Sequence, residues 1–357
     1  MTRIVAVRSG FPDNQCVQAD FTAKFAELGR LDPPQRALLE RLHANSGVDT
    51  RHTILPLEKC GSLRGIEAVN DRYIAEATGL GERVLRAALD EAGLAAADLD
   101  LLIVTSVTGV AVPSLDARLI PRLGLRPDIK RLPVFGLGCV AGAAALARLH
   151  DYLLGWPGHN AALLAIELCS LNWPTAGMTT ADLVVSGLFG DGAAALVGTG
   201  RSPGGVPAGP PAGFPRILAT RSEVYPDSGG ALGWQLRSDC FRIVLTAELS
   251  DVVERNLGGS VTSFLAGHGL TVEEIGTWIC HPGGPRVLDA AQKSLKLPDS
   301  AMALSRRSLA DVGNLSSVSV LHILERAIAT EPPPPGSLGL MIGLGPGVSA
   351  ELVLMQW

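Results

Sequence analysis

Short runs of apolar residues alternate with helix-like patterns along most of the chain. Continuous apolar runs of this length predict buried strands, and the alanine and leucine spacing between them predicts helices. We expect an α/β fold in which helical crossovers connect the strands of a sheet. Strands are predicted at 101–105, 161–166, 193–197, 275–280 and 338–342, and helices at 140–153, 251–265 and 287–295.

Two segments rich in proline and glycine interrupt this pattern. Residues 203–215 (PGGVPAGPPAGFP) cannot form a helix or a central strand, because proline lacks the backbone donor and glycine adds flexibility. We place the domain boundary here, between an N-terminal half at 1–205 and a C-terminal half at 206–357. The EPPPPGS segment at 331–337 is predicted to be a rigid exposed connector. Both halves mix strands with helices, which allows a duplication too diverged to show as sequence identity.

Composition narrows the class of protein. The 357 residues are 47% hydrophobic, yet no apolar run is long enough to span a membrane. The first apolar stretch is too short for a signal peptide, so we expect a first strand and a cytoplasmic protein. The net charge is −5 and no basic run carries interleaved aromatics, so we expect no nucleic-acid partner. The six cysteines and seven histidines show no metal-ligand spacing, which predicts reduced thiols and no metal site.

Cys139 is the first candidate for chemistry. It follows a short apolar run at 131–138, predicted as a buried strand, and precedes the alanine-rich helix. A helix N-terminus favours thiolate over thiol, so we expect a lowered cysteine pKa there. Such a turn can also hold a nucleophile at the mouth of a pocket. A lone buried cysteine more often serves packing, so a functional interpretation needs partner residues.

A histidine and an asparagine are suitable partners for a thiolate nucleophile. His281, in WICHPGGPRVLDA, stands at the end of a predicted strand beside glycines, where α/β folds place chemistry. Asn314, in DVGNLSSVSVLHIL, occupies the N-cap position of a helix predicted from about residue 315, and an ordinary cap is the alternative. The glycines of GLGPGVSAEL, 343–352, permit a tight loop under a ligand. Neither GxGxxG nor a Walker A motif occurs, so we expect no nucleotide for hydride or phosphoryl transfer.

Six segments together resemble the type III polyketide synthase (chalcone synthase-like) family of the thiolase superfamily. They are TSVTGVAVPSLDARLIPRLGLRPDIKR, GLGCVAGAAAL, SGLFGDGAAALVG, HPGGPRVLDA, GNLSSVSVLHIL and GLGPGVSAE, and they occur in the family's order. The resemblance extends from about Arg51 to Glu351, and ELCSLNWPTAGMTTADLVVSGLFGDGAAAL is similar to bacterial members. It implies a five-layered αβαβα thiolase-like fold with two duplicated halves, a homodimer, and coenzyme A thioesters as substrates with no further cofactor.

The resemblance also implies a mechanism. A Cys-His-Asn triad carries over to Cys139, His281 and Asn314, with Cys139 accepting the acyl group of an acyl-CoA. Malonyl-CoA would then lose CO2, and His281 and Asn314 would donate hydrogen bonds to the enolate oxygen. Repeated extension and cyclisation would give a polyketide. Because several bacterial members accept fatty acyl starters, we expect alkylpyrones or alkylresorcinols.

Further positions carry over one by one. Phe189 matches a gatekeeper between the coenzyme A tunnel and the cavity, and the alternative interpretation is an aromatic residue of the hydrophobic core. The position of the second gatekeeper corresponds to Ile243. Of three basic positions for coenzyme A phosphates only Arg41 is retained, since the other two are Leu38 and Asn45. The remaining assignments are Cys169, Asn172, Trp234 and Ser316 to the substrate cavity, Gly283 and Gly284 to coenzyme A binding, and Val112 to a segment crossing into the dimer partner.

Three alternatives remain beside the polyketide interpretation. One is a β-ketoacyl synthase III-like enzyme with a single condensation and an acyl carrier protein as partner, for which GLGPGVSAE and LFGDGAAA are less typical. Another is a noncatalytic acyl-CoA-binding protein, which would have no need for all three triad residue types. A papain-like protease is disfavoured because the CGSC[WY] signature is missing. The starter, the number of extensions, the ring closure and the choice between malonyl and methylmalonyl extenders stay open.

Overall fold

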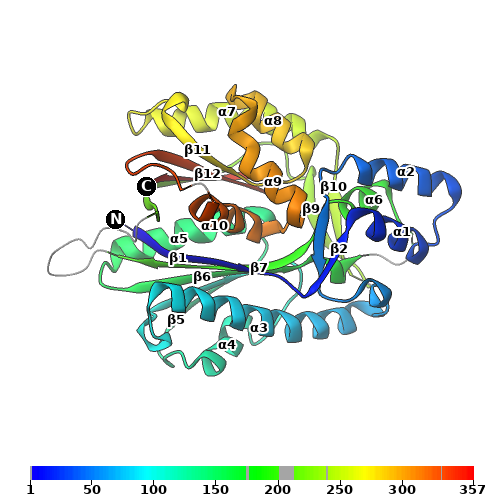
Figure 1. Cartoon of the computed structure of the whole chain (residues 1–357), viewed down its shortest axis with the longest axis horizontal. Helices are drawn as coiled ribbons and strands as arrows, with labels where there is room; N and C mark the ends of the chain where they lie inside the picture. Colours follow the sequence, from blue (N-terminus) through cyan, green and yellow to red (C-terminus); the bar gives the residue numbers. More distant parts are fainter. Residues whose placement is uncertain (1, 174–176, 201–212, 239, 331) are drawn as a thin grey trace.

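The computed structural model describes residues 2–173, 177–200, 213–238, 240–330 and 332–357. Its strands and helices are stacked in layers (Figure 1). The strands are β1 (Thr2–Gly10), β2 (Asn14–Val17), β3 (Thr50–Thr53), β4 (Leu101–Thr105), β5 (Lys130–Val134), β6 (Asn160–Leu168), β7 (Asp191–Thr199), β8 (Arg216–Val224), β9 (Leu232–Leu236), β10 (Phe241–Leu245), β11 (Ile275–Cys280), β12 (Leu338–Gly345) and β13 (Ser349–Gln356). The helices are α1 (Gln18–Leu28), α2 (Pro33–Ala44), α3 (Gly65–Ala92), α4 (Leu115–Leu123), α5 (Ala141–Gly155), α6 (Thr180–Ser186), α7 (Glu248–Ala266), α8 (Pro285–Leu295), α9 (Ala303–Val312) and α10 (Ser319–Thr330).

One main sheet connects the two ends of the chain. Among the described residues it contains nine strands in the order β11-β12-β13-β8-β1-β7-β6-β4-β5. β4 pairs in parallel with β5 and β6, and β11 with β12, so helical crossovers must connect these strands. The two parts of the sheet meet at a short contact, where β1 and β8 pair only at Thr2↔Ile217 and Arg3↔Arg216.

Three hydrophobic cores define the layers. α3 and α4 pack on the outer face of β4, β6 and β7, and α7 and α8 cover the outer face of β11, β12 and β13. α5 and α10 fill the space between the two parts of the sheet. Figure 1 shows the resulting order of helix, sheet, helix, sheet and helix. The predicted α/β fold with five thiolase-like layers is therefore confirmed.

The strand runs are continuously apolar because helices cover both of their faces. In β4, Leu101 and Ile103 pack against the central helices, whereas Leu102 and Val104 pack against α3 and α4. The strands predicted at 101–105, 161–166, 193–197, 275–280 and 338–342 are present as β4, β6, β7, β11 and β12, and the first strand is β1. The helices predicted at 140–153, 251–265 and 287–295 are present as α5, α7 and α8.

Beyond the short β1–β8 contact the two parts of the sheet separate, and β1 needs other partners. The backbone N–H of Val7 donates to Glu91 of α3 at 3.0 Å, and that of Ser9 donates to Glu325 of α10 at 2.9 Å. Arg8 forms ion pairs with both carboxylates, at 2.8 and 3.9 Å. Since a buried backbone donor without a partner costs free energy, these carboxylates allow β1 to continue between the helices.

Two sequence predictions of local structure are wrong. β5 is the last strand at its edge of the main sheet and four of its five residues are exposed, so it is not the predicted buried strand. The helix expected from about residue 315 begins at Ser319, after a 3-10 turn at Ser316–Val318, so Asn314 is not its N-cap. The boundary predicted at 205/206 lies outside the described residues.

The central layer depends on a close backbone contact at Gly142. A Cβ atom at this position of α5 would lie 2.0 Å from the carbonyl oxygen of Ser317. Only glycine allows the start of α5 to approach the turn before α10 this closely. The same contact brings the segment of Cys139 beside that of Asn314.

We predict that Gly142→Ala lowers the free energy of unfolding by about 1–3 kcal/mol, because the added methyl group displaces the Ser317 carbonyl. Gly155→Ala, in the last turn of the same helix, is the matched control, since a Cβ there meets open space. That alanine should be neutral or stabilising by up to about 1 kcal/mol. Urea unfolding measures both variants. A Gly142→Ala protein as stable as the wild type would contradict the close contact.

Candidate active site

Cys139 lies in a tight turn between β5 and α5. It belongs to a 3-10 helix at Gly138–Val140, and Gly138 has a φ of 59°, in the left-handed region that favours glycine. The glycine-rich loop between β12 and β13 packs beneath this turn. A Cβ atom on Gly345 would lie 2.8 Å from the backbone nitrogen of Val140. The loop therefore makes room for the cysteine turn, and Gly345 also lines the cavity beside it.

Cys139, His281 and Asn314 line one cavity of about 30 Å³. They come from three separate elements, namely the turn before α5, the end of β11 and the stretch before α10. The backbone N–H of His281 donates to the carbonyl oxygen of Ile342 in β12 at 2.9 Å, which fixes the histidine at the strand end. The fold thus brings the predicted triad together. The cavity is otherwise largely apolar and includes Leu188, Phe189, Leu232, Ile243, Leu245 and Val287.

The backbone and side chain of Asn314 are both held in place. Its N–H donates to the carbonyl oxygen of Leu188 at 2.8 Å, and its own carbonyl accepts from Gly190 N–H at 3.1 Å. Its side-chain Oδ1 accepts from Ser316 N–H at 2.8 Å. Because Oδ1 takes this donor, the Nδ2 group must point the other way. Nδ2 makes no hydrogen bond with the described residues and is therefore free to donate to a substrate.

The His281 ring is buried and uncharged. Burial lowers the pKa of its imidazole to about 3, because the charged form loses its hydration. Nδ1 is buried and has no hydrogen-bond partner among the described residues. Hydrogen bonding between this ring and a substrate therefore falls to Nε2.

The Cys139 thiol is also uncharged, which corrects the expectation of a lowered pKa. Burial raises the pKa of this thiol to about 12. A hydrogen bond with the Ser316 hydroxyl acts in the opposite direction, and the carboxylate of Glu167 adds to the increase. The loss of hydration therefore outweighs the helix N-terminus. Cys139 and His281 are therefore both uncharged in the cavity that they share.

Glu167 is a functional candidate that the sequence analysis misses. It is fully buried at the end of β6 and accepts hydrogen bonds from Ser317 Oγ at 2.5 Å and from Val107 N–H at 3.1 Å. Burial raises the pKa of its carboxyl group to about 7. The available signal is a lone acidic residue near the end of the apolar run NAALLAIEL. Nothing in that pattern alone places the carboxylate beside Cys139.

A second cavity of about 20 Å³ contains the predicted wall residues Cys169, Asn172 and Trp234. Phe189 and Ile243 line both cavities. They therefore lie between the two cavities, and their role as gatekeepers stays a prediction. The amide of Asn172 is bonded at both ends. Its Nδ2 donates to the carbonyl oxygen of Thr108 at 2.8 Å and its Oδ1 accepts from Phe241 N–H at 3.1 Å. Asn172 therefore shapes the wall and offers the substrate little hydrogen bonding.

The remaining predicted positions lie around this site at different depths. Gly283 lines the first cavity, while Gly284 has a φ of 134° at the start of α8. Ser316 is fully buried beneath Cys139. Arg41 is exposed in the last turn of α2, and Val112 is 91% exposed. Arg41 and Val112 are therefore separate from the cavity of the same chain.

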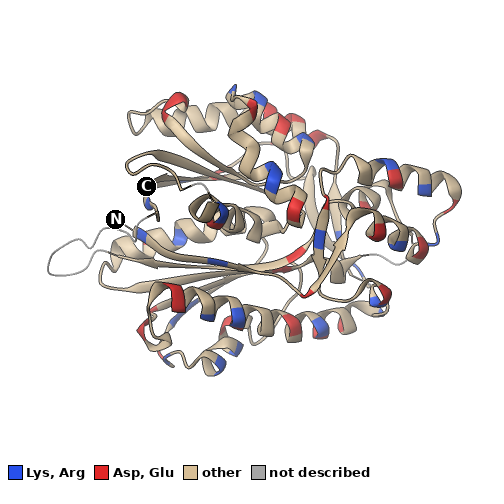
Figure 2. Ribbon diagram, in the orientation of Figure 1, with Lys and Arg blue, Asp and Glu red and all other residues tan. Residues whose placement is uncertain are grey.

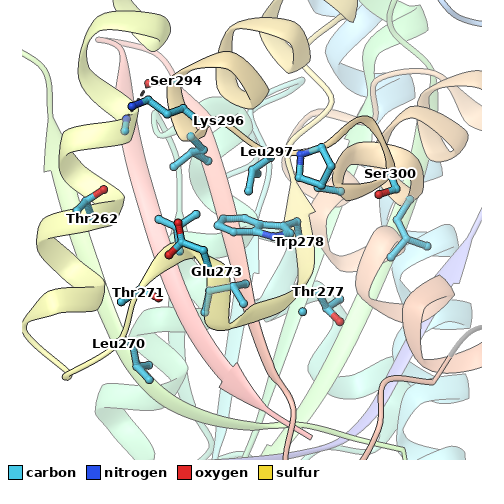
Figure 3. A pocket seen from close by; sticks show the side chains of 18 of the residues that line it. Thr262, Leu270, Thr271, Glu273, Thr277, Trp278, Ser294, Lys296, Leu297 and Ser300 are labelled. Carbon is cyan, nitrogen blue, oxygen red and sulfur yellow. Dashed lines mark hydrogen bonds between the residues drawn. The ribbon is translucent and has the colours of Figure 1, made fainter.

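A larger cavity of about 1330 Å³ lies between α7, α8 and β11 and contains none of the predicted site residues. Figure 3 shows Trp278 at its centre, with Glu273 and Lys296 nearby.

Figure 2 shows charges of both signs along α2, α3 and α8, with no large region of one sign. Within the described residues, no group of His, Cys, Asp and Glu could hold a metal ion, and no helix is long and apolar enough to cross a bilayer.

Comparisons with known proteins decide the family. Residues 1–203 match the N-terminal domain of chalcone and stilbene synthases, and residues 216–357 match the C-terminal domain. The chain belongs to the chalcone and stilbene synthase family. This membership favours the polyketide interpretation over the three alternatives.

Three bacterial proteins illustrate what this chalcone synthase-like chain is similar to. It is 50% identical to a 1,3,6,8-tetrahydroxynaphthalene synthase of Streptomyces peucetius subsp. caesius, covering 100% of this chain and 93% of the relative. It is 34% identical to a 3,5-dihydroxyphenylacetyl-CoA synthase of Amycolatopsis orientalis, covering 88% and 84%. The crystal structure of the tetrahydroxynaphthalene synthase of Streptomyces coelicolor A3(2), a bacterial type III polyketide synthase, superposes with a TM-score of 0.92 at 32% identity, covering 99% of both chains.

The chain is therefore a type III polyketide synthase, an acyltransferase that performs decarboxylative condensations. Enzymes of this family use coenzyme A thioesters as substrates and need no additional cofactor, which agrees with the expectation from the sequence. The family does not fix the product. These relatives are named for tetrahydroxynaphthalene and dihydroxyphenylacetyl-CoA, and not for the alkylpyrones or alkylresorcinols expected from the sequence.

We predict that Glu167→Gln increases the rate of Cys139 alkylation by iodoacetamide several-fold at pH 8. The carboxylate raises the pKa of the thiol, so a neutral amide lowers that pKa and increases the thiolate fraction. Glu167 ionises near pH 7, so the difference from the wild type should grow as the pH rises through 7 and vanish near pH 5. Mass spectrometry of the Cys139 peptide gives the rates. A rate ratio that does not change with pH would contradict the assigned charge effect.

Proposed function

We propose that Cys139 is the nucleophile and that His281 and Asn314 bind the negative charge that develops on the substrates. The thiol of Cys139 transfers its proton to His281 Nε2 as Sγ forms a bond with the thioester carbonyl carbon. The carbon–sulfur bond to coenzyme A breaks, and the CoA thiolate leaves and is protonated by solvent. The new negative charge beside the ring compensates for the burial that lowers the histidine pKa.

The same two donors serve the condensation. When malonyl-CoA loses CO2, the electron pair of the broken carbon–carbon bond forms an enolate, whose oxygen accepts hydrogen bonds from His281 Nε2 and Asn314 Nδ2. The enolate carbon then attacks the acyl carbonyl on Cys139, the carbon–sulfur bond to Sγ breaks, and the Cys139 thiolate takes back its proton from His281. The observation that supports this proposal is that Asn314 lines the cavity of Cys139 and His281 while its Oδ1 is bonded to Ser316 N–H, which leaves Nδ2 without a hydrogen-bond partner among the described residues.

We further propose that malonyl-CoA serves as both starter and extender, and that the product is 1,3,6,8-tetrahydroxynaphthalene or a similar small aromatic polyketide. The relative at 50% identity supports this product. The ten ring carbons of a naphthalene correspond to five two-carbon units. Five malonyl-CoA molecules would release five CO2, five coenzyme A and one water to give it, with no oxidant required.

The size of the cavity supports a small starter. The space beside Cys139 is about 30 Å³, close to the volume of one water molecule, and Phe189 and Ile243 close it toward the second cavity. The alkylpyrone or alkylresorcinol expected from the sequence stays a prediction and is the second outcome of the test below.

Binding of coenzyme A and pairing of subunits complete the proposal. Gly283 lines the cavity and Gly284 follows it, so the thioester arm enters beside them, with Arg41 at the surface for the phosphates. β4 and β5 end side by side, so Phe135, which is 57% exposed, and Val112 follow neighbouring strand ends. Such exposed apolar side chains are typical of an interface. The homodimer is proposed with this face buried, and light scattering tests it; the cytoplasmic location and the lack of a nucleic-acid partner stay predictions.

We predict that the purified enzyme forms an aromatic pentaketide from malonyl-CoA alone. The assay gives malonyl-CoA with and without acyl-CoA starters of graded length and identifies the products by mass. If the closed cavity excludes long tails, hexanoyl-CoA and longer starters should add no new product. Alkylpyrones formed in preference to the malonyl-only product would overturn the proposed starter.

The Trp234→Gly and Ile243→Ala variants should widen the range of starters that the enzyme accepts, because both residues line the second cavity.

We predict that Asn314→Ala lowers decarboxylation of malonyl-CoA by about 100- to 1,000-fold, since it removes one donor to the enolate oxygen. Acyl loading on Cys139 should continue, whereas Cys139→Ala should hold no labelled acyl group. Release of labelled CO2 and trapping of the acyl-enzyme measure the two steps. Unchanged CO2 release from the Asn314→Ala enzyme would show that this amide does not bind the enolate.

A further inference from the structure

Arg51 of β3 is the largest fully buried side chain of the described part of the molecule. It makes no direct ion pair with a described carboxylate, although the buried Asp191 is near enough for the charges of the two groups to shift each other's pKa. Its guanidinium donates instead to backbone carbonyls of one short segment. Nη1 donates to Ser186 at 2.6 Å and to Phe189 at 2.7 Å, and Nη2 donates to Gly187 at 2.7 Å. Nη2 also donates to the side-chain oxygen of Gln18.

This pattern requires an arginine. A planar guanidinium spreads its donors over separate nitrogens in a fixed fork, so that Nη1 and Nη2 reach carbonyl oxygens at different places, whereas the three donors of a lysine all sit on one nitrogen. The ring of Phe21 lies 4.2 Å from the guanidinium carbon and covers one face of it. Burying a positive charge without a directly bonded carboxylate costs free energy. The arrangement is therefore expected where a backbone segment must be held rigidly.

The segment that Arg51 holds is the one that holds Asn314. The Leu188 carbonyl accepts from Asn314 N–H, and Gly190 N–H donates to the Asn314 carbonyl. The two backbones are in close contact, since a Cβ on Gly190 would lie 2.4 Å from the carbonyl oxygen of Val312. Residues 186–190 are thus fixed by Arg51 on one side and fix Asn314 on the other. The same segment carries Leu188 and Phe189 into the cavity.

We infer that Arg51 is a positioning residue for the decarboxylation and condensation steps, acting through residues 186–190 on the Asn314 amide and the Phe189 gate. The inference rests on the proposed role of Asn314 as an enolate donor. Cys139 lies on a different element, the turn before α5, which Arg51 does not contact. Loss of the guanidinium should therefore impair enolate formation selectively and spare the thiol.

The experiment compares Arg51→Lys and Arg51→Met with the wild-type enzyme. We expect kcat for CO2 release from malonyl-CoA to fall about 10- to 100-fold, as for other small displacements of a catalytic group, with KM changed less than about threefold. Alkylation of Cys139 by iodoacetamide should stay within about twofold of the wild-type rate. Arg51→Lys should retain more activity than Arg51→Met, because it keeps a charged nitrogen that can donate hydrogen bonds. For an Arg51→Ala enzyme, guanidinium ions at millimolar concentration should restore part of kcat, whereas urea should not.

Leu257→Ala, in the outer core of α7, is the control for general destabilisation. It should lower the melting temperature and leave kcat per folded molecule unchanged. Equal losses of alkylation and decarboxylation in the Arg51 variants, or no loss of either, would overturn the inference. If neither variant folds, Gln18→Leu decides, because it removes the side-chain oxygen that orients Nη2; unchanged decarboxylation would then count against the inference. Retained decarboxylation in Asn314→Ala would instead reject the proposed enolate site itself.

Discussion

The whole site depends on how closely the start of α5 approaches the turn before α10. Gly142 lets the two backbones touch, and Gly345 lets the loop after β12 contact the same cysteine turn. The proposed nucleophile, Cys139, belongs to the first half of the chain, and His281 and Asn314 belong to the second. A methyl group at Gly142 would therefore separate residues that lie far apart in sequence and that act together in the proposed mechanism. Packing of the two halves and catalysis share one contact surface.

Burial, more than helix geometry, sets the chemistry of this surface. It raises the pKa of the Cys139 thiol and lowers that of the His281 imidazole, so both groups wait without charge. In the proposed mechanism, Cys139 and His281 become charged only when a thioester enters and the proton of the thiol moves to the imidazole. Glu167 adds a nearby negative charge that opposes a thiolate. An uncharged resting thiol is less prone to oxidation or alkylation in the absence of substrate, because the thiolate is the reactive form.

The sequence predicts those parts of the structure that follow from local pattern. β4 and β11 are found at the predicted bounds because strands covered on both faces read as unbroken apolar runs. The meeting of Cys139, His281 and Asn314 at one cavity is predictable because each residue lies in a specific motif, whereas their catalytic roles stay a proposal. β5 is misplaced because an edge strand and a buried strand can share the same letters, and the capping role expected of Asn314 fails because the helix starts later. Glu167 and Arg51 are missed because their contacts join residues more than a hundred positions apart.

The carboxylates that bond to β1 have a wider consequence. If β8 paired with β1 along its full length, the two parts of the sheet would form one continuous surface. Glu91 and Glu325 take the place of that neighbour and let the strands diverge into a wedge. The two innermost helices, α5 and α10, fit inside this wedge, and the segments of Cys139 and Asn314 lead into them. Two acidic side chains outside the cavity thus help to hold apart the layers between which these residues lie.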